Sequence, residues 1–265
     1  MASKKNLSGV LQLFSGAWEI YIRRFKVFLG IILIPALVIL FGSAMAAGGA
    51  KIFEVSFFGL LPLMAGASLA ILGAFIALWA RLALIYAIKD EKLGAGESYS
   101  ESWPKFFSYW WIAILTGFLM LAGFFLFVIP AFVFGVWFVF AGFALVFDNQ
   151  KGLSALVKSR EYVRGRWRPV FWRLFLLAAA MGILSSVPVF GQIVAFLAWP
   201  FFMVYLYLIF TELKSFRGKA AVTKAVKNKI VILGVLGWLV PVLLITAAAA
   251  IILILQFSYP QLLLP

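Results

Sequence analysis

The chain has 265 residues, of which 65% are hydrophobic and 12% are charged, and its net charge is +14. Soluble domains are about half apolar and about a quarter charged, so a soluble fold could not bury this much apolar surface, whereas a lipid bilayer accepts it. The absence of Cys and His excludes disulfides, thiolate and imidazole catalysis, and the usual zinc, copper and haem sites.

The chain opens on an amphipathic segment. Over residues 7–25 apolar side chains recur every three or four positions, which predicts a helix lying flat in the membrane interface. Spans are then expected at residues 27–47 and 57–86, because each holds the roughly 20 apolar residues needed to cross the hydrocarbon layer. A polar segment, 89–101, follows the second span.

Two features mark the second span. Small residues return at seven-residue intervals, which favours close packing against another helix, with a substrate path along that face as the alternative. Arg81 is a charge within the span, either a functional group or a side chain that reaches back to the headgroups. The small residues are Gly59, Gly66, Gly73, Ala80 and Ala87.

The later apolar stretches predict five more spans. Residues 106–147 contain no charge and are too long for one helix, so we expect two helices joined by a turn at Ile129-Pro130-Ala131. Residues 174–211 should break similarly at Ser185-Ser186-Val187-Pro188. The seventh span is expected at 230–256. The fold class is therefore all-α, a polytopic transmembrane bundle of about seven spans.

The basic residues indicate the orientation. With this span count, one side of the membrane holds only Lys51 and Glu54, and the other holds 22 of 23 basic and 8 of 9 acidic residues. Because cytoplasmic segments carry the excess of Lys and Arg, we expect a cytoplasmic N-terminus and an outside C-terminus. The location expected is the cytoplasmic (inner) membrane of a prokaryote.

A short pattern recurs before three of the spans. Residues 19–26 and 161–168 both read as an acid, four residues, Arg, an aromatic residue and a base, and a shorter version occupies 100–106. We therefore predict one membrane domain, 1–265, made of three units, each an interfacial helix followed by a transmembrane hairpin. The units are 7–88, 98–147 and 153–213, followed by a basic connector, 214–229, and the seventh span.

Basic residues at the span entries form a collar on the predicted cytoplasmic side. Such residues attract anionic lipid headgroups. The collar either sets topology alone or binds headgroups between the units, and the second interpretation makes it the candidate lipid site. Its members are Arg23, Arg24, Lys26, Arg160, Arg164, Arg166, Trp167, Arg168 and Arg173.

Other activities find little support. The sequence has no P-loop, no GxSxG motif and no paired carboxylates at useful spacing, so we expect no catalytic residue, no cofactor and no metal site. No Asp or Glu lies deep in a span, which argues against proton- or sodium-coupled transport. The positive charge borders apolar spans, so we expect anionic membrane lipid rather than nucleic acid as the partner.

Three stretches resemble a known family. Residues 127–137 (FVIPAFVFGVW), Phe147-Asp148-Asn149 and residues 152–165 (GLSALVKSREYVRG) are similar to the membrane domain found with some glycerophosphoryl diester phosphodiesterases and to related uncharacterised prokaryotic membrane families. The opening helix is similar as well, and Ala131 stands where the family usually has Gly. The resemblance covers about 7–213, and it implies a membrane domain without the catalytic domain.

These observations favour a non-enzymatic membrane protein, either a scaffold or a binder of anionic lipid at its cytoplasmic face. The alternative is a transporter or permease subunit for a hydrophobic or amphiphilic solute. The alternative requires a cavity between units, lined by the face that carries the small residues from Gly59 to Ala87.

Overall fold

The computed structural model describes residues 7–126, 128–188, 190–217 and 224–258. Across these ranges the regular structure is helical, as the sequence predicts. Two short 3-10 turns, Phe57–Gly59 and Trp103–Lys105, precede α3 and α5. The helices are α1 (Val10–Arg23), α2 (Phe25–Phe53), α3 (Leu60–Lys89), α4 (Ala95–Ser102), α5 (Phe106–Phe125), α6 (Val128–Phe138), α7 (Ala141–Asp148), α8 (Leu153–Val163), α9 (Trp167–Ser185), α10 (Phe190–Arg217) and α11 (Lys224–Ser258).

Seven helical segments are long and apolar enough to cross a bilayer. They correspond to α2, α3, α4 with α5, α6 with α7, α9, α10 and α11, so the predicted number of spans is confirmed among the described residues. The chain is a multi-pass integral membrane protein. Several helices exceed the predicted spans: α2 continues to Phe53, and α3 continues to Lys89.

The small residues of α3 lie against α2. A Cβ added at Gly66 would lie 2.3 Å from the backbone nitrogen of Ala46, and one added at Gly73 would lie 2.5 Å from the Ile39 side chain. Gly59, in the 3-10 turn that precedes α3, is equally tight against Phe53. Because glycine has no side chain, the backbones of α2 and α3 approach each other closely along much of the hairpin.

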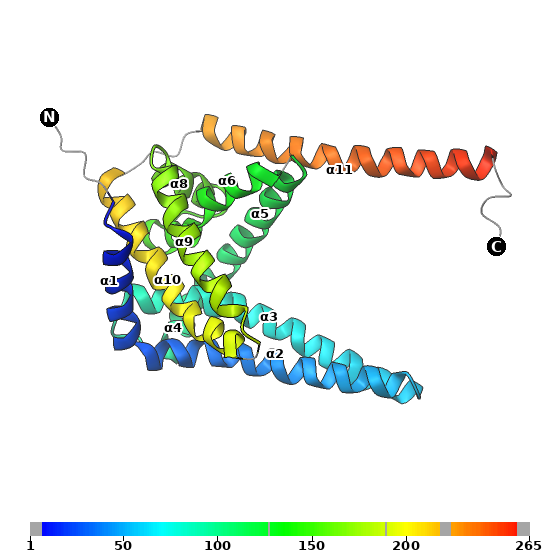
Figure 1. Cartoon of the computed structure of the whole chain (residues 1–265), viewed down its shortest axis with the longest axis horizontal. Helices are drawn as coiled ribbons and strands as arrows, with labels where there is room; N and C mark the ends of the chain where they lie inside the picture. Colours follow the sequence, from blue (N-terminus) through cyan, green and yellow to red (C-terminus); the bar gives the residue numbers. More distant parts are fainter. Residues whose placement is uncertain (1–6, 127, 189, 218–223, 259–265) are drawn as a thin grey trace.

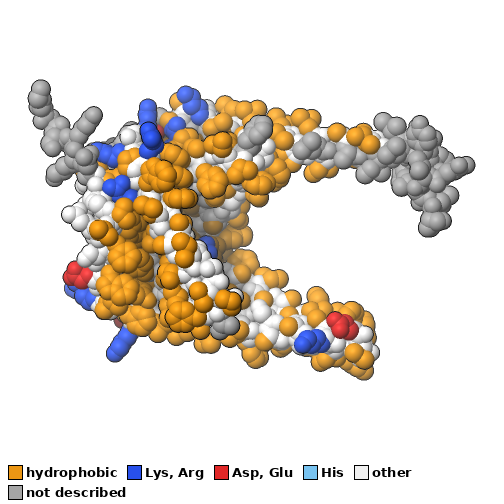
Figure 2. All heavy atoms as spheres, viewed as in Figure 1, with side chains coloured by type: hydrophobic (Ala, Val, Ile, Leu, Met, Phe, Trp, Pro, Cys, Tyr) orange, Lys and Arg blue, Asp and Glu red, His pale blue; other side chains and the backbone are white. Residues whose placement is uncertain are grey.

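Two long arms extend from the body of the molecule in the same direction (Figure 1). One arm is the α2–α3 hairpin and the other is α11, which packs on α5. The Trp238 indole donates a hydrogen bond to the Phe118 carbonyl at 3.2 Å, and their rings stack at 4.8 Å. Figure 2 shows the hollow between the arms, with mainly apolar side chains on the visible walls.

One predicted turn is wrong and another is right. Helix α5 ends at Phe125 and α6 begins at Val128. Pro130 therefore lies in the first helical turn of α6 and not in the connection between the two spans. Proline is tolerated there because the first helical N–H groups have no partner within the helix. The predicted break at 185–188 is confirmed, since α9 ends at Ser185 and α10 begins at Phe190.

The fourth span is interrupted between α6 and α7. Ser159 of α8 is fully buried beside the interruption. Its hydroxyl donates to the Trp137 carbonyl at 2.5 Å and accepts from the Phe140 N–H at 3.1 Å. An irregular backbone at membrane depth must find such partners within the protein, and Ser159 supplies them.

Helix α1 has the surface expected of an interfacial helix. Leu13, Ala17 and Tyr21 are buried against the body, and the Tyr21 hydroxyl donates to the Leu197 carbonyl of α10 at 2.9 Å. The other face exposes Leu11 at 83% and Trp18 at 51%. Large apolar side chains on a short exposed helix face fit contact with the acyl boundary.

The entries into three spans share a local conformation. A basic residue stands immediately before α2, α5 and α9, and an aromatic residue begins each of these helices. The φ and ψ angles are −112° and 16° at Arg24, −104° and 0° at Lys105, and −130° and 22° at Arg166. The larger three-unit repeat stays a prediction.

Candidate functional site

A basic pocket lies where α1 meets α2, opposite the loop between α3 and α4. Its volume is about 690 Å³, and we call it the junction pocket. Four basic side chains and one carboxylate line it, so the lining carries a net charge of +3. The charged residues are Arg23, Arg24, Lys26, Lys92 and Glu91, and apolar side chains of Ile22, Phe25, Val27 and Leu93 complete the wall.

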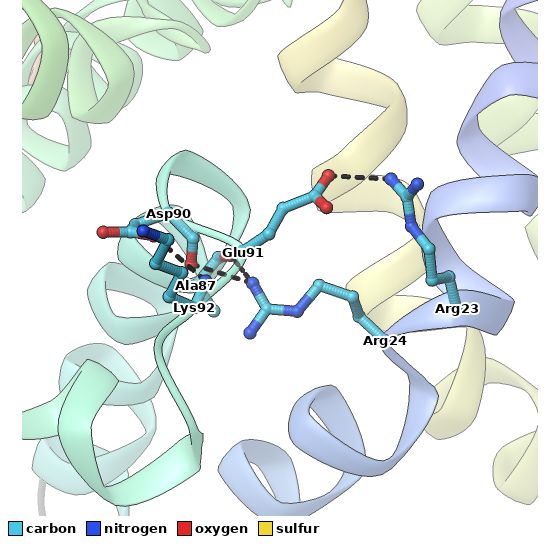
Figure 3. Close-up of polar contacts among 6 residues, drawn as sticks. All are labelled: Arg23, Arg24, Ala87, Asp90, Glu91 and Lys92. Atoms are coloured by element: carbon cyan, nitrogen blue, oxygen red, sulfur yellow. Dashed lines mark hydrogen bonds and ion pairs between the residues drawn. The ribbon is translucent and has the colours of Figure 1, made fainter.

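Arg24 forms the fixed side of the junction pocket. Only 6% of the residue is exposed, and its guanidinium donates to the carbonyls of Ala87 and Asp90, with 2.9 Å to Asp90 (Figure 3). It also donates to the Leu93 carbonyl. The last carbonyls of a helix lack intrahelical partners and carry partial negative charge, so Arg24 stabilises the end of α3. Burial lowers the pKa of Arg24, and the nearby charge of Glu91 opposes this effect.

Arg23 and Glu91 form an exposed pair at the rim. Their side chains meet at 2.7 Å, with 53% and 58% of their surfaces exposed (Figure 3). Pairs this accessible contribute little stability, because water and salt screen them. Arg23 can therefore exchange Glu91 for another anion at small cost.

Lys26 and Lys92 supply the accessible charge of the junction pocket. Both residues are exposed, and neither ammonium group has a hydrogen bond or ion pair within the described ranges. Lys26 also lies in the first turn of α2, where the helix dipole favours an anion. The pocket therefore combines two accessible ammonium groups, an exchangeable Arg23 and the positive end of a helix.

The second basic group predicted from sequence has a different environment. Glu161 is buried and pairs with Arg160 at 3.5 Å and Arg164 at 3.4 Å. The Arg160 guanidinium also lies 4.7 Å from the Trp137 ring centroid, and that of Arg166 lies 4.1 Å from Phe216. Much of this charge is therefore engaged with protein groups.

The remaining predicted residues spread along α9. Arg173 donates to the carbonyls of Leu7, Ser8 and Pro169, which ties α9 to the segment before α1. Trp167 stacks on Phe171 at 5.0 Å, and Arg168 is exposed. None of these residues lines the junction pocket, so the predicted collar divides into two separate groups.

Lys92 and Glu91 were missed by sequence reasoning, which described residues 89–101 only as a polar segment. The α2–α3 hairpin offers a signal for the position of this loop. Gly73 lies against Ile39 and Gly66 lies against Ala46, and these two contacts define the antiparallel register of the two helices. Continued toward the basic end, that register brings Arg24 level with Ile88, next to the loop that carries Lys92.

In the part of the chain that the structure describes, no group of three or more Asp or Glu side chains is arranged to hold a metal ion. Comparison with family models, curated proteins and solved structures finds no match for this chain. The resemblance to the phosphodiesterase-associated membrane domain therefore stays a prediction.

Proposed function

We propose that this membrane protein is a non-enzymatic binder of anionic phospholipid, which holds a phosphate headgroup in the junction pocket at the cytoplasmic surface. One observation carries the proposal: a cavity with a net lining charge of +3 whose Lys26 and Lys92 ammonium groups are exposed and lack protein partners within the described ranges.

The location of the pocket supports a lipid rather than a soluble anion. Helix α1 exposes apolar side chains beside the pocket, and α2 enters the apolar spans directly from it. A lipid headgroup would reach Lys26 and Lys92 while its acyl chains remain in the bilayer. Each basic residue near an anionic leaflet contributes about 1 kcal/mol to such binding. The cytoplasmic assignment rests on the excess of Lys and Arg at this end.

The transporter alternative has weaker support. It requires a cavity lined by the small residues of α3, yet Gly66 and Gly73 are packed against α2. Of the five small residues, only Ala80 lines the groove between α2, α3 and α10.

Native mass spectrometry of protein released gently from its membrane tests the proposal. The decisive variant is Lys26→Gln/Lys92→Gln, matched by Lys51→Gln/Lys151→Gln, which removes the same charge from exposed positions outside the pocket. We expect the affinity of the first variant for anionic phospholipid to fall about thirtyfold, and the matched variant to retain its lipid.

A third variant, Arg164→Gln/Arg166→Gln/Arg168→Gln, separates the two basic groups. If it loses lipid while Lys26→Gln/Lys92→Gln does not, the headgroup site lies at α8–α9 and the junction pocket is wrong. Equal retention by all variants would leave the basic residues as a topology signal only.

A further inference from the structure

A second cavity lies deeper along α3, between α2, α3 and α10. Its volume is about 560 Å³, within the range of small-ligand pockets, and nearly all of its lining is apolar. The charged residue of the lining is Arg81, near the end closest to the basic face of the protein, and Ser43 adds a hydroxyl at the other end. We call this cavity the Arg81 groove. Its walls include Ile32, Pro35, Ile39, Ser43, Ala77 and Trp199.

Arg81 is a charged group with no carboxylate partner among the described residues. Its guanidinium lies 5.0 Å from the Trp199 ring centroid, and no hydrogen bond or ion pair joins it to any other described residue. Arg81 is exposed, and it lines the groove. Lys89 lies eight residues further, which is about 12 Å along the helix. A charge at this depth is costly unless an anion or water meets it.

A smaller cavity of about 190 Å³ adjoins the groove. Arg81 and Trp199 line both cavities, so the two meet at the guanidinium. Tyr109 of α5 also lines the smaller one, and its hydroxyl has no hydrogen-bond partner in the described part of the chain. The N–H groups of Arg81 and the O–H of Tyr109 are donors bordering one small space. Two donors beside one positive charge suit a small anionic group.

The groove has the length and direction of an acyl chain. The α2–α3 register, set by Gly73 against Ile39, brings Arg81 level with Ile31, beside Ile32 at one end of the groove. The lining then continues along α2 to Ser43. From Ile32 to Ser43 the helix rises about 16 Å, at 1.5 Å for each of eleven steps. The charged end faces the basic side of the protein, and the apolar end runs toward the bilayer interior.

We propose that the Arg81 groove binds a single-chain carboxylate amphiphile, a long-chain fatty acid. Its carboxylate accepts hydrogen bonds from Arg81 and Tyr109, and its chain lies against α2 and Trp199. The smaller cavity, of about 190 Å³, lies at the guanidinium and takes the compact carboxylate, and the experiment below separates a fatty acid from a phospholipid. The site is separate from the junction pocket and does not depend on the proposed function.

A different cavity serves as a comparison for the Arg81 groove. A cavity of about 480 Å³ between α5, α6 and α9 has a lining of apolar and glycine residues only. Lipid chains can lie there, but nothing in it selects a charged end. Ala178 lines this second groove as Ala77 lines the first, so the pair offers matched positions for blocking each cavity.

The experiment uses a photoreactive palmitate analogue on the full chain in micelles, with the labelled peptides located by mass spectrometry. We expect labelling of α2 and α10 beside the groove. Arg81→Gln should lower it about tenfold, because a charge-assisted contact is lost. Lys51→Gln, which removes a charge from the far end of the same hairpin, should leave it unchanged. Ala77→Phe should abolish the labelling, and Ala178→Phe should not.

Two further probes identify the occupant. A photoreactive long-chain alcohol of the same length should label the groove at least about tenfold less than the acid. Equal labelling by alcohol and acid, or by the parent and Arg81→Gln, would overturn the carboxylate site. Labelling by a two-chain phosphatidylglycerol analogue that excludes the palmitate analogue would overturn the single-chain occupant.

If Arg81→Gln does not fold, Arg81→Lys decides the question, because it keeps the charge and loses the forked donor geometry. Reduced palmitate labelling in Arg81→Lys, together with full labelling in Ala178→Phe, supports the site. Unchanged labelling in both Arg81→Lys and Ala77→Phe overturns it.

Discussion

The entries into α2 and α9 begin alike and end differently. Arg24 and Arg166 occupy the same position in the recurring pattern and have nearly the same backbone angles. Arg24 is buried and caps the carbonyl end of α3, whereas Arg166 lies over the Phe216 ring of α10. The neighbouring helix end therefore decides what a basic residue at a span entry does.

The acids of the two patterns differ in the same way. Glu19 is exposed, whereas Glu161 is buried between Arg160 and Arg164. In the first pattern α1 continues through Arg23, and in the second the chain turns at Gly165 with φ of 80°. The first junction leaves accessible charge around a pocket, whereas the second uses much of its charge internally.

Replacing the two arginines gives the largest expected contrast. Arg24→Gln should lower the free energy of unfolding by about 3 kcal/mol, because buried carbonyls of the α3 end lose a charged donor. Arg166→Gln should cost less than Arg24→Gln, because Arg166 is only half-buried and its contact with the Phe216 ring contributes about 1 kcal/mol. Unfolding in micelles, followed by Trp fluorescence, measures both. Equal losses of unfolding free energy would show that Arg24 and Arg166 stabilise the protein to the same extent.

The two acids should differ less. Glu161→Gln is expected to cost about 2 kcal/mol, because it removes the charge that compensates Arg160 in a partly buried pair. Glu19→Gln should change stability by no more than about 0.5 kcal/mol, as exposed substitutions usually do. The same unfolding measurement applies, and a larger loss for Glu19→Gln would reverse the assigned roles.

The turn residue gives the smallest contrast. Gly165→Ala should cost about 1–2 kcal/mol, because a Cβ is unfavourable at positive φ. Arg23→Ala, at the corresponding helical position, loses only an exposed ion pair and should lie within about 0.5 kcal/mol of the parent. Comparing both thermal unfolding midpoints in one detergent suffices, and a costly Arg23→Ala would mean that the Glu91 pair is structural.

The spans were predictable because bilayer thickness fixes the length of apolar sequence that each helix needs. The positions of the breaks between helices were less predictable. Pro188 lies at a break and Pro130 lies inside a helix, although each stands within a long, mainly apolar stretch. Proline fits the first turn of a helix as well as a loop, so composition alone does not separate the two cases. The interruption between α6 and α7 depends on Ser159, which is distant in sequence and gives no local signal.

The candidate sites were only partly predictable. Arg23, Arg24 and Lys26 were found from their charge, because a basic cluster beside a span is visible in the sequence. Lys92 and Trp199 were not, since each belongs to its site through contact with another helix. The sequence placed Arg81 in a span, but its contact with Trp199 depends on how α10 crosses α3.

The spacing of the small residues on α3 has a geometric consequence. A contact that returns every seven residues, rather than following a repeat of about 3.6, requires two helices to wind slightly around each other with a left-handed twist. Gly66 and Gly73 thereby fix the rotation of α3 about its own axis. One residue inserted between Gly73 and Arg81 would turn the guanidinium by about 100° without shortening the span. The number of residues between the glycines and Arg81 thus determines which way Arg81 faces.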